Sequence, residues 1–170
     1  MNRINITAAL LLLIGAFYQA SGQQMHMYAF ARTPQLANYN FSNESATYSE
    51  GVSAGVGIYR KSLFLEVATF IFDGDTYGYY TFFGTTVKSN EIAPSIYLNT
   101  NVFGEVTTLP SQSDIDDPLW IYTSGVCFMP NVQVQKLNVG IALCSGLAYQ
   151  EESFSLNNRF ILNLAFTIGK

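Results

Sequence analysis

Charged residues are scarce in this sequence. Only 12% of its 170 residues are charged and 15% are aromatic, whereas about 25% of residues are charged in a typical soluble domain. Cysteine is scarce as well, because only Cys127 and Cys144 are present. Two cysteines exclude a small fold held together by several disulfides.

Long hydrophobic runs are missing after residue 22. Before it, a basic start at residues 1–3 precedes an apolar run at residues 4–17, and the small residue Gly22 ends the segment. This arrangement is typical of a cleaved signal peptide, so we expect residues 1–22 to be removed and residues 23–170 to form one domain. No later stretch reaches the roughly 20 apolar residues of a transmembrane helix, so any membrane role must use strands.

Helical periodicity is also missing, and an alternation with a period of two residues takes its place. It is clearest from Leu137 to Tyr149, where large apolar residues at odd positions alternate with small residues at even positions. Such alternation is typical of strands with two different faces. We expect eight strands, near residues 25–32, 48–59, 62–72, 77–87, 92–103, 119–129, 137–149 and 159–168.

The connections between these strands are of two kinds. Tight turns are expected at Arg60-Lys61, Lys88-Ser89-Asn90 and Pro130-Asn131. Longer loops are expected at residues 33–47, 73–76, 104–118 and 150–157, and they contain or adjoin most of the acidic residues. An even number of strands, with short turns at one end and longer loops at the other, indicates a closed barrel of the bacterial outer membrane.

The two faces of the strands separate a membrane barrel from a soluble one. A secreted soluble barrel, such as a lipocalin-like carrier of a small apolar ligand, is the alternative and needs a hydrated exterior. Here the less apolar face carries Gly, Ala, Ser and Asn, which suits the narrow lumen of an eight-stranded barrel. We therefore expect the large residues, among them Val139, Ile141 and Leu143, to face lipid. Aromatic residues fit the interfacial girdles, with Tyr77, Tyr79, Trp120, Tyr122 and Tyr149 at the loop end and Tyr59 at the turn end.

In strand number, alternation and connections, the region from Gln23 to Lys170 resembles the small eight-stranded outer-membrane β-barrel proteins represented by outer-membrane proteins A and X. The resemblance is architectural and rests on no diagnostic motif. It implies an all-β, antiparallel up-and-down transmembrane barrel in the outer membrane of a Gram-negative bacterium. One departure is the C-terminus, where Lys170 replaces the aromatic residue that the assembly machinery recognises, which leaves Phe166 as a displaced substitute.

The resemblance also implies a structural or surface-interaction role. The expected partners are outer-membrane lipid and, through the acidic loops, lipopolysaccharide or an extracellular ligand; nucleic acid is not expected. A barrel of eight strands is filled by its own side chains, so we do not expect a general pore.

Few residues indicate catalysis or metal binding. A lipid A-modifying barrel needs His with Ser, and usually an acid, near the outer leaflet, whereas the single histidine, His26, lies at the predicted periplasmic end. We therefore predict no catalytic residue and no cofactor. Asp114, Asp116 and Asp117 could collect a divalent cation, but the Gly and Glu of a calcium loop are missing. A solvated acidic loop is the preferred interpretation.

The cysteines are predicted to be free thiols. With Pro130-Asn131 as a two-residue turn, Cys127 lies opposite Val134, ten residues from Cys144. That separation is roughly 33 Å along a strand, beyond the reach of a disulfide.

Three charged residues lie inside or at the edges of predicted strands: Glu66, Lys136 and Arg159. A carboxylate in a narrow lumen needs a cationic or hydrogen-bonding partner. We therefore predict that Glu66 pairs with Lys136 or Arg159 and helps to fill the lumen. The alternative is a hydrated Glu66 near the turn end.

Overall fold

Eight antiparallel strands form a closed barrel. The computed structural model describes residues 25–42, 44–74, 76–109, 118–150 and 153–168, so the predicted signal peptide lies outside the described residues. The strands are β1 (His26–Asn40), β2 (Ser45–Arg60), β3 (Leu63–Phe72), β4 (Thr76–Ala93), β5 (Ile96–Leu109), β6 (Leu119–Val134), β7 (Leu137–Gln150) and β8 (Ser153–Ile168). Each strand pairs with the next along the chain, and β1 also pairs with β8. The predicted all-β, up-and-down barrel is confirmed.

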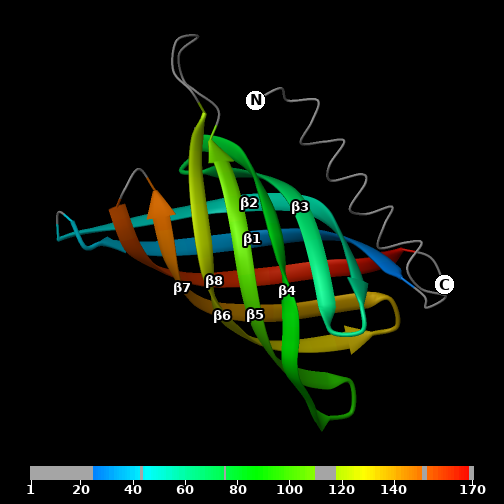
Figure 1. Ribbon diagram of the computed structural model, residues 1–170. Helices are drawn as coiled ribbons and strands as arrows, with labels where there is room; N and C mark the ends of the chain where they lie inside the picture. The colour runs from blue at the N-terminus through cyan, green and yellow to red at the C-terminus, as the bar shows by residue number, and fades with distance from the viewer. Residues whose placement is uncertain (1–24, 43, 75, 110–117, 151–152, 169–170) are drawn as a thin grey trace.

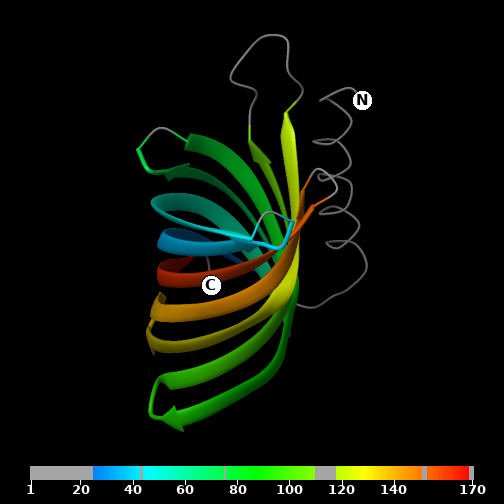
Figure 2. The same ribbon diagram turned by 90° about the vertical axis from the view of Figure 1, so that its left-hand side faces the viewer.

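The ring of strands is closed between its first and last members. In Figure 1, β1 (blue) lies between β2 and β8 (red), and the turned view in Figure 2 shows the strands curving together into one wall. Within the described ranges, no helix is long and apolar enough to cross a membrane.

The barrel has two different ends. At the turn end, two-residue connections join β2 to β3, β4 to β5 and β6 to β7, and each contains a residue with positive φ: Lys61 (53°), Ser95 (65°) and Gln135 (53°). At the loop end, the connections are residues 41–44, 73–75, 110–118 and 151–152. The predicted turn after Arg60 is confirmed to within one residue.

Two of the predicted turns are wrong. Residues 88–90 lie within β4, which continues to Ala93, and Pro130-Asn131 lies within β6, which continues to Val134. Proline has no N–H to donate, and the pairing of β6 with β7 is interrupted beside Pro130, passing from Phe128 directly to Asn131. The strand therefore accommodates the proline without turning.

The predicted loops are also longer than the observed ones. β1 runs to Asn40, β2 begins at Ser45, β5 runs to Leu109 and β8 begins at Ser153. In these strand extensions, some of the outward residues are polar, and they hide the apolar alternation in the sequence. Backbone pairing does not need that alternation, so the ladder continues past it.

Most of the large aliphatic side chains point outward, as predicted. Val139, Ile141 and Leu143 are 47%, 38% and 53% exposed, whereas the alternate residue Ala142 is 2% exposed. The same alternation places Val52 and Val56 on the outside of β2. An apolar exterior of this kind is favourable in acyl chains and unfavourable in water.

The outward tyrosines and the tryptophan that are exposed gather toward the loop end, together with Phe154. They are Tyr39 of β1, Tyr48 of β2, Tyr77 and Tyr79 of β4, Trp120 and Tyr122 of β6, Tyr149 of β7 and Phe154 of β8. Each lies in the half of its strand that is nearer the loops, so together they form a girdle around the barrel. Tyr59, predicted for the girdle at the turn end, instead lies on the inward side of β2 and stacks on His26, with ring centroids 4.8 Å apart.

The centre of the lumen is filled by side chains. Phe82 and Phe103 stack with ring centroids 4.9 Å apart, and Ile161, Ala142 and the two cysteines pack against them. We call this cluster the lumenal plug (Phe82, Phe103, Cys127, Ala142, Cys144 and Ile161). Ile161 is a large apolar residue on an inward face of β8 that is otherwise small or polar, and its place in the plug accounts for it.

Candidate functional site

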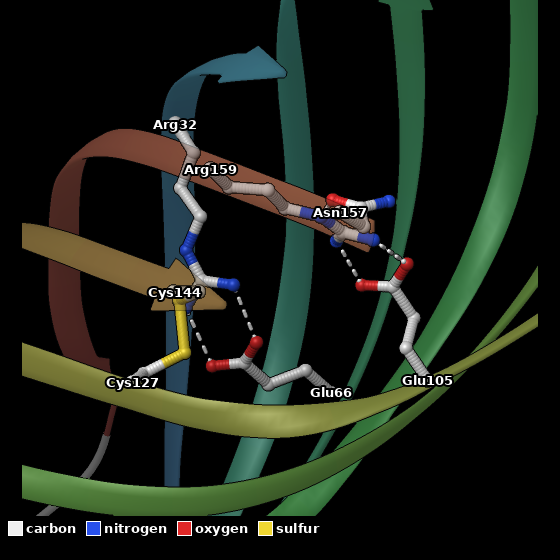
Figure 3. The surroundings of a disulfide bond; sticks show 7 residues. All are labelled: Arg32, Glu66, Glu105, Cys127, Cys144, Asn157 and Arg159. Atoms are coloured by element: carbon white, nitrogen blue, oxygen red, sulfur yellow. Dashed lines mark hydrogen bonds and ion pairs between the residues drawn. A yellow bond between two sulfur atoms is a disulfide. The ribbon is translucent and has the colours of Figure 1, made fainter. Parts of the chain in front are cut away.

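Two buried ion pairs cross the lumen beside the plug. In the first, Arg32 of β1 donates from both terminal nitrogens to Glu66 of β3, at 2.5 Å and 2.7 Å. The side chains of Arg32 and Glu66 are only 9% and 4% exposed. Figure 3 shows the guanidinium and the carboxylate facing each other across the interior. The pair ties two strands that are not neighbours in the barrel wall.

Two neighbouring side chains make further hydrogen bonds to this first pair. The hydroxyl of Tyr28 donates to Glu66 Oε1 at 2.6 Å, and Arg32 Nε donates to Asn163 Oδ1 at 2.7 Å. Gly57 lies between Tyr28 and Glu66 in the strand register. A Cβ at Gly57 would lie 2.4 Å from the Tyr28 ring, so the glycine leaves the space through which Tyr28 reaches the carboxylate.

The second pair joins Arg159 of β8 to Glu105 of β5. The two terminal nitrogens of Arg159 donate to the Glu105 carboxylate at 2.5 Å and 2.7 Å. Thr107 donates to Glu105 Oε1 at 2.8 Å, and Arg159 Nε donates to Asn157 Oδ1 at 3.0 Å. Both charges are therefore paired inside the lumen (Figure 3).

The partners predicted for Glu66 are wrong. Glu66 pairs with Arg32, Arg159 pairs with Glu105, and Lys136 lies in the turn between β6 and β7. The sequence pattern puts Arg32 at the end of the first expected strand and Glu105 in an expected loop, so it does not predict that either side chain faces the lumen. The alternation along β5 could have identified Glu105 as an inward residue, because Glu105 shares parity with the inward residues Asn101 and Phe103.

Cys127 and Cys144 form a disulfide, so the prediction of free thiols is wrong. The two residues are directly paired across β6 and β7, and their Cα atoms are 4.0 Å apart. Moving the turn from residues 130–131 to residues 135–136 changes the register and brings the cysteines together. They face the lumen as part of the plug, as Figure 3 shows.

Peptide mapping of the purified, non-reduced protein should find Cys127 and Cys144 in one cross-linked species. Alkylating reagents should label neither residue until the protein is unfolded and reduced, because the disulfide leaves no thiolate to react and both residues are buried. Labelling of both thiols in the native, non-reduced protein would contradict the observed register.

A cavity of about 220 Å³ occupies the part of the lumen between the plug and the loop end. At its inner end it touches the disulfide and Ile161, and at its outer end it touches Leu36, Asp73 and Leu109. Its walls are mainly apolar, and both arginines of the ion pairs line it. The lumen is thus blocked near its middle and open to a small molecule on one side of the block.

The other predicted site residues do not join this region. Asp114, Asp116 and Asp117 lie outside the described residues. His26 lies at the turn end against Tyr59. Among the residues whose positions are described, no group of three or more His, Cys, Asp or Glu side chains could hold a metal ion.

Comparison with known proteins identifies the fold. Neisserial surface protein A has 8% sequence identity to this chain and a TM-score of 0.64, and the match covers 86% of this chain and 100% of that protein. This is the fold of a small outer-membrane β-barrel. The resemblance inferred from strand number and connections is therefore confirmed at the level of fold. No protein-family model and no curated protein sequence matches the chain.

Two further barrels match with lower scores. The N-terminal barrel domain of OprF from Pseudomonas aeruginosa has 10% identity and a TM-score of 0.43, with 82% of this chain and 97% of that chain covered. The attachment invasion locus protein of Yersinia pestis has 7% identity and a TM-score of 0.39, with 84% and 99% covered. At these identities, function has to be argued from the residues of this chain.

Proposed function

We propose that the protein resides in the outer membrane of a Gram-negative bacterium and has a structural or surface-interaction role there, without acting as a general pore or an enzyme. The observation that carries this proposal is an apolar exterior around a lumen that is blocked by its own side chains. The exterior supports membrane insertion, and the blocked lumen argues against conduction.

The exterior favours a membrane protein over the soluble carrier. A soluble barrel of this size would cover its outer face with charged and polar side chains. Here most of the large exposed side chains away from the strand ends are Val, Leu, Ile and Phe, and an aromatic girdle follows toward the loop end. Aromatic girdles of this kind lie at the membrane interface in barrels of this fold.

Fractionation of cells that express the protein tests its location. We expect the protein in the outer-membrane fraction and in the detergent phase after phase partition. A folded barrel should also migrate differently on a gel before and after boiling. Recovery in the aqueous phase would favour the secreted soluble carrier instead.

The blocked lumen predicts the absence of stable conductance. Purified protein in planar lipid bilayers should give no reproducible single-channel steps, because the plug and two ion pairs fill the middle of the lumen. A known porin, purified in the same detergent, serves as the positive control. Regular conductance steps with this protein would show that the plug moves aside in a bilayer.

The loop end is the proposed interaction surface. Several acidic residues lie there, including the exposed Glu44 and Glu50, so a partner with positive charge or bound cations is favoured. Outer-membrane lipid, lipopolysaccharide bridged by divalent cations and a basic extracellular ligand are the proposed partners. The position of His26 at the opposite end, stacked on Tyr59, supports a non-enzymatic role.

A further inference from the structure

We propose that the lumenal cavity at the loop end binds a small neutral molecule that combines an apolar body, such as a single aromatic ring, with one hydrogen-bonding group. This proposal concerns the interior of the barrel and does not depend on the surface role proposed above. It rests on the size of the cavity, on its walls and on the pairing of the charges at its inner end.

The size of the cavity suits one small molecule. Its volume is about 220 Å³, whereas an apolar cavity of about 150 Å³ holds benzene. A benzene ring with a small substituent therefore fits, and a sugar chain or a lipid with long acyl chains does not.

The walls of the cavity are suited to an apolar body. Pro34 and Leu36 of β1, Phe70 and Phe72 of β3, and Ile121 of β6 line it. These residues lie on the inward face. A lumen filled with water would favour polar side chains there, so the apolar lining indicates a site for an apolar molecule. Transfer of an aromatic ring from water to this surface is favourable because apolar area is removed from water on both sides.

The inner end of the cavity offers hydrogen-bonding atoms without net charge. Arg159 is paired with Glu105, and Arg32 with Glu66, so each positive charge is balanced. The hydroxyls of Ser53 and Tyr80 are 3.4 Å apart, at the limit of a hydrogen bond, so a ligand group can bond to them at little cost. A neutral hydroxyl or amide group matches this environment, whereas an additional charge would be left without a partner.

The ligand can enter from the loop end alone. The lining reaches Asp73, Thr76 and Leu109 at the loop end, while the plug closes the opposite side. The cavity is therefore a blind pocket within the described part of the barrel, and a bound molecule leaves by the route it entered.

Binding can be measured with 4-fluorophenol by fluorine NMR, using the full chain in detergent micelles and protein-free micelles as the partition control. We expect a protein-dependent, saturable shift. Ile121→Trp, which places a larger side chain in the cavity, should weaken binding by about tenfold or more, since the indole takes the space of the ligand. The matched variant Tyr122→Trp changes the adjacent outward residue and should bind as the unchanged protein does.

The charge of the probe tests the proposed chemistry. The anion 4-fluorobenzoate should bind about tenfold or more weakly than 4-fluorophenol, because an unpaired charge is costly to bury. If Ile121→Trp loses its heat-dependent gel shift and is therefore not folded, Leu36→Trp takes its place. Absence of a saturable shift, equal binding in the inward and outward variants, or equal binding of the anion would overturn the proposal.

Discussion

Replacing Val126 by arginine is expected to destabilise the protein in lipid vesicles by about 2 to 4 kcal/mol, or to prevent its insertion altogether. Val126 is an outward residue in the middle of β6, and it lies on the apolar exterior. A guanidinium at this depth loses its hydration and finds no charged partner. Equilibrium unfolding by denaturant in vesicles of one defined lipid measures the change.

The same strand provides a matched control. Val134 also faces outward but lies at the turn end of β6, where the membrane interface is expected. Val134→Arg should cost only about 0 to 1 kcal/mol, because the cost of a cation falls toward the interface. Equal effects at the two positions, or an unchanged stability of Val126→Arg, would contradict a lipid-facing exterior and restore the soluble barrel.

Replacing Glu66 by glutamine should lower the free energy of unfolding by about 3 to 5 kcal/mol. The substitution keeps the size of the side chain but leaves the Arg32 guanidinium buried without its counter-charge. The hydroxyl of Tyr28 also loses a charged acceptor. The measurement is again equilibrium unfolding in lipid vesicles or detergent.

Two control measurements test whether the effect of Glu66→Gln comes from the loss of its ion pair with Arg32. Glu50→Gln changes an exposed carboxylate at the loop end and should alter stability by no more than about 0.5 kcal/mol. Removing both charges, in the double variant Arg32→Gln and Glu66→Gln, should cost less than the sum of the two single changes. Additive effects would mean that the two side chains do not interact in the folded protein.

The ion pairs and the disulfide explain how a narrow barrel can hold charge inside. The Arg32–Glu66 and Arg159–Glu105 pairs each link two strands that are not adjacent in the wall. The disulfide adds a covalent link between β6 and β7 at the same level of the lumen, where it packs with Phe103 and Ile161. Together they give the middle of the barrel a fixed interior and leave the cavity on the loop side.

Alternation along the chain was sufficient to predict the barrel and its orientation. Along Leu137 to Tyr149, large residues at odd positions alternate with smaller ones at even positions, with Ser145 as the one small residue among the odd positions. The large residues face outward as expected. A strand places successive side chains on opposite faces, so the pattern contains the orientation directly. The number of strands followed from the same pattern.

Register was harder to predict, and the cysteines show why. Pro130-Asn131 has the composition of a turn, yet the turn formed five residues later at Gln135 and Lys136. A shift of this size changes every cross-strand neighbour while leaving the alternation of each strand almost untouched. The disulfide therefore could not be derived from spacing alone.

The sequence by itself determined which residues face outward from the barrel, because that choice depends only on parity within each strand and on the apolar character of one face. The tertiary structure decided which charges meet. Arg32 and Glu66 lie on strands separated by one other strand, and Arg159 and Glu105 on strands separated by two, so the curvature of the wall and the stagger of its strands bring each pair together. It also decided that the lumen is filled at the middle and hollow toward the loops. Both features depend on the stagger between strands around the whole barrel, and no local segment of sequence encodes that stagger.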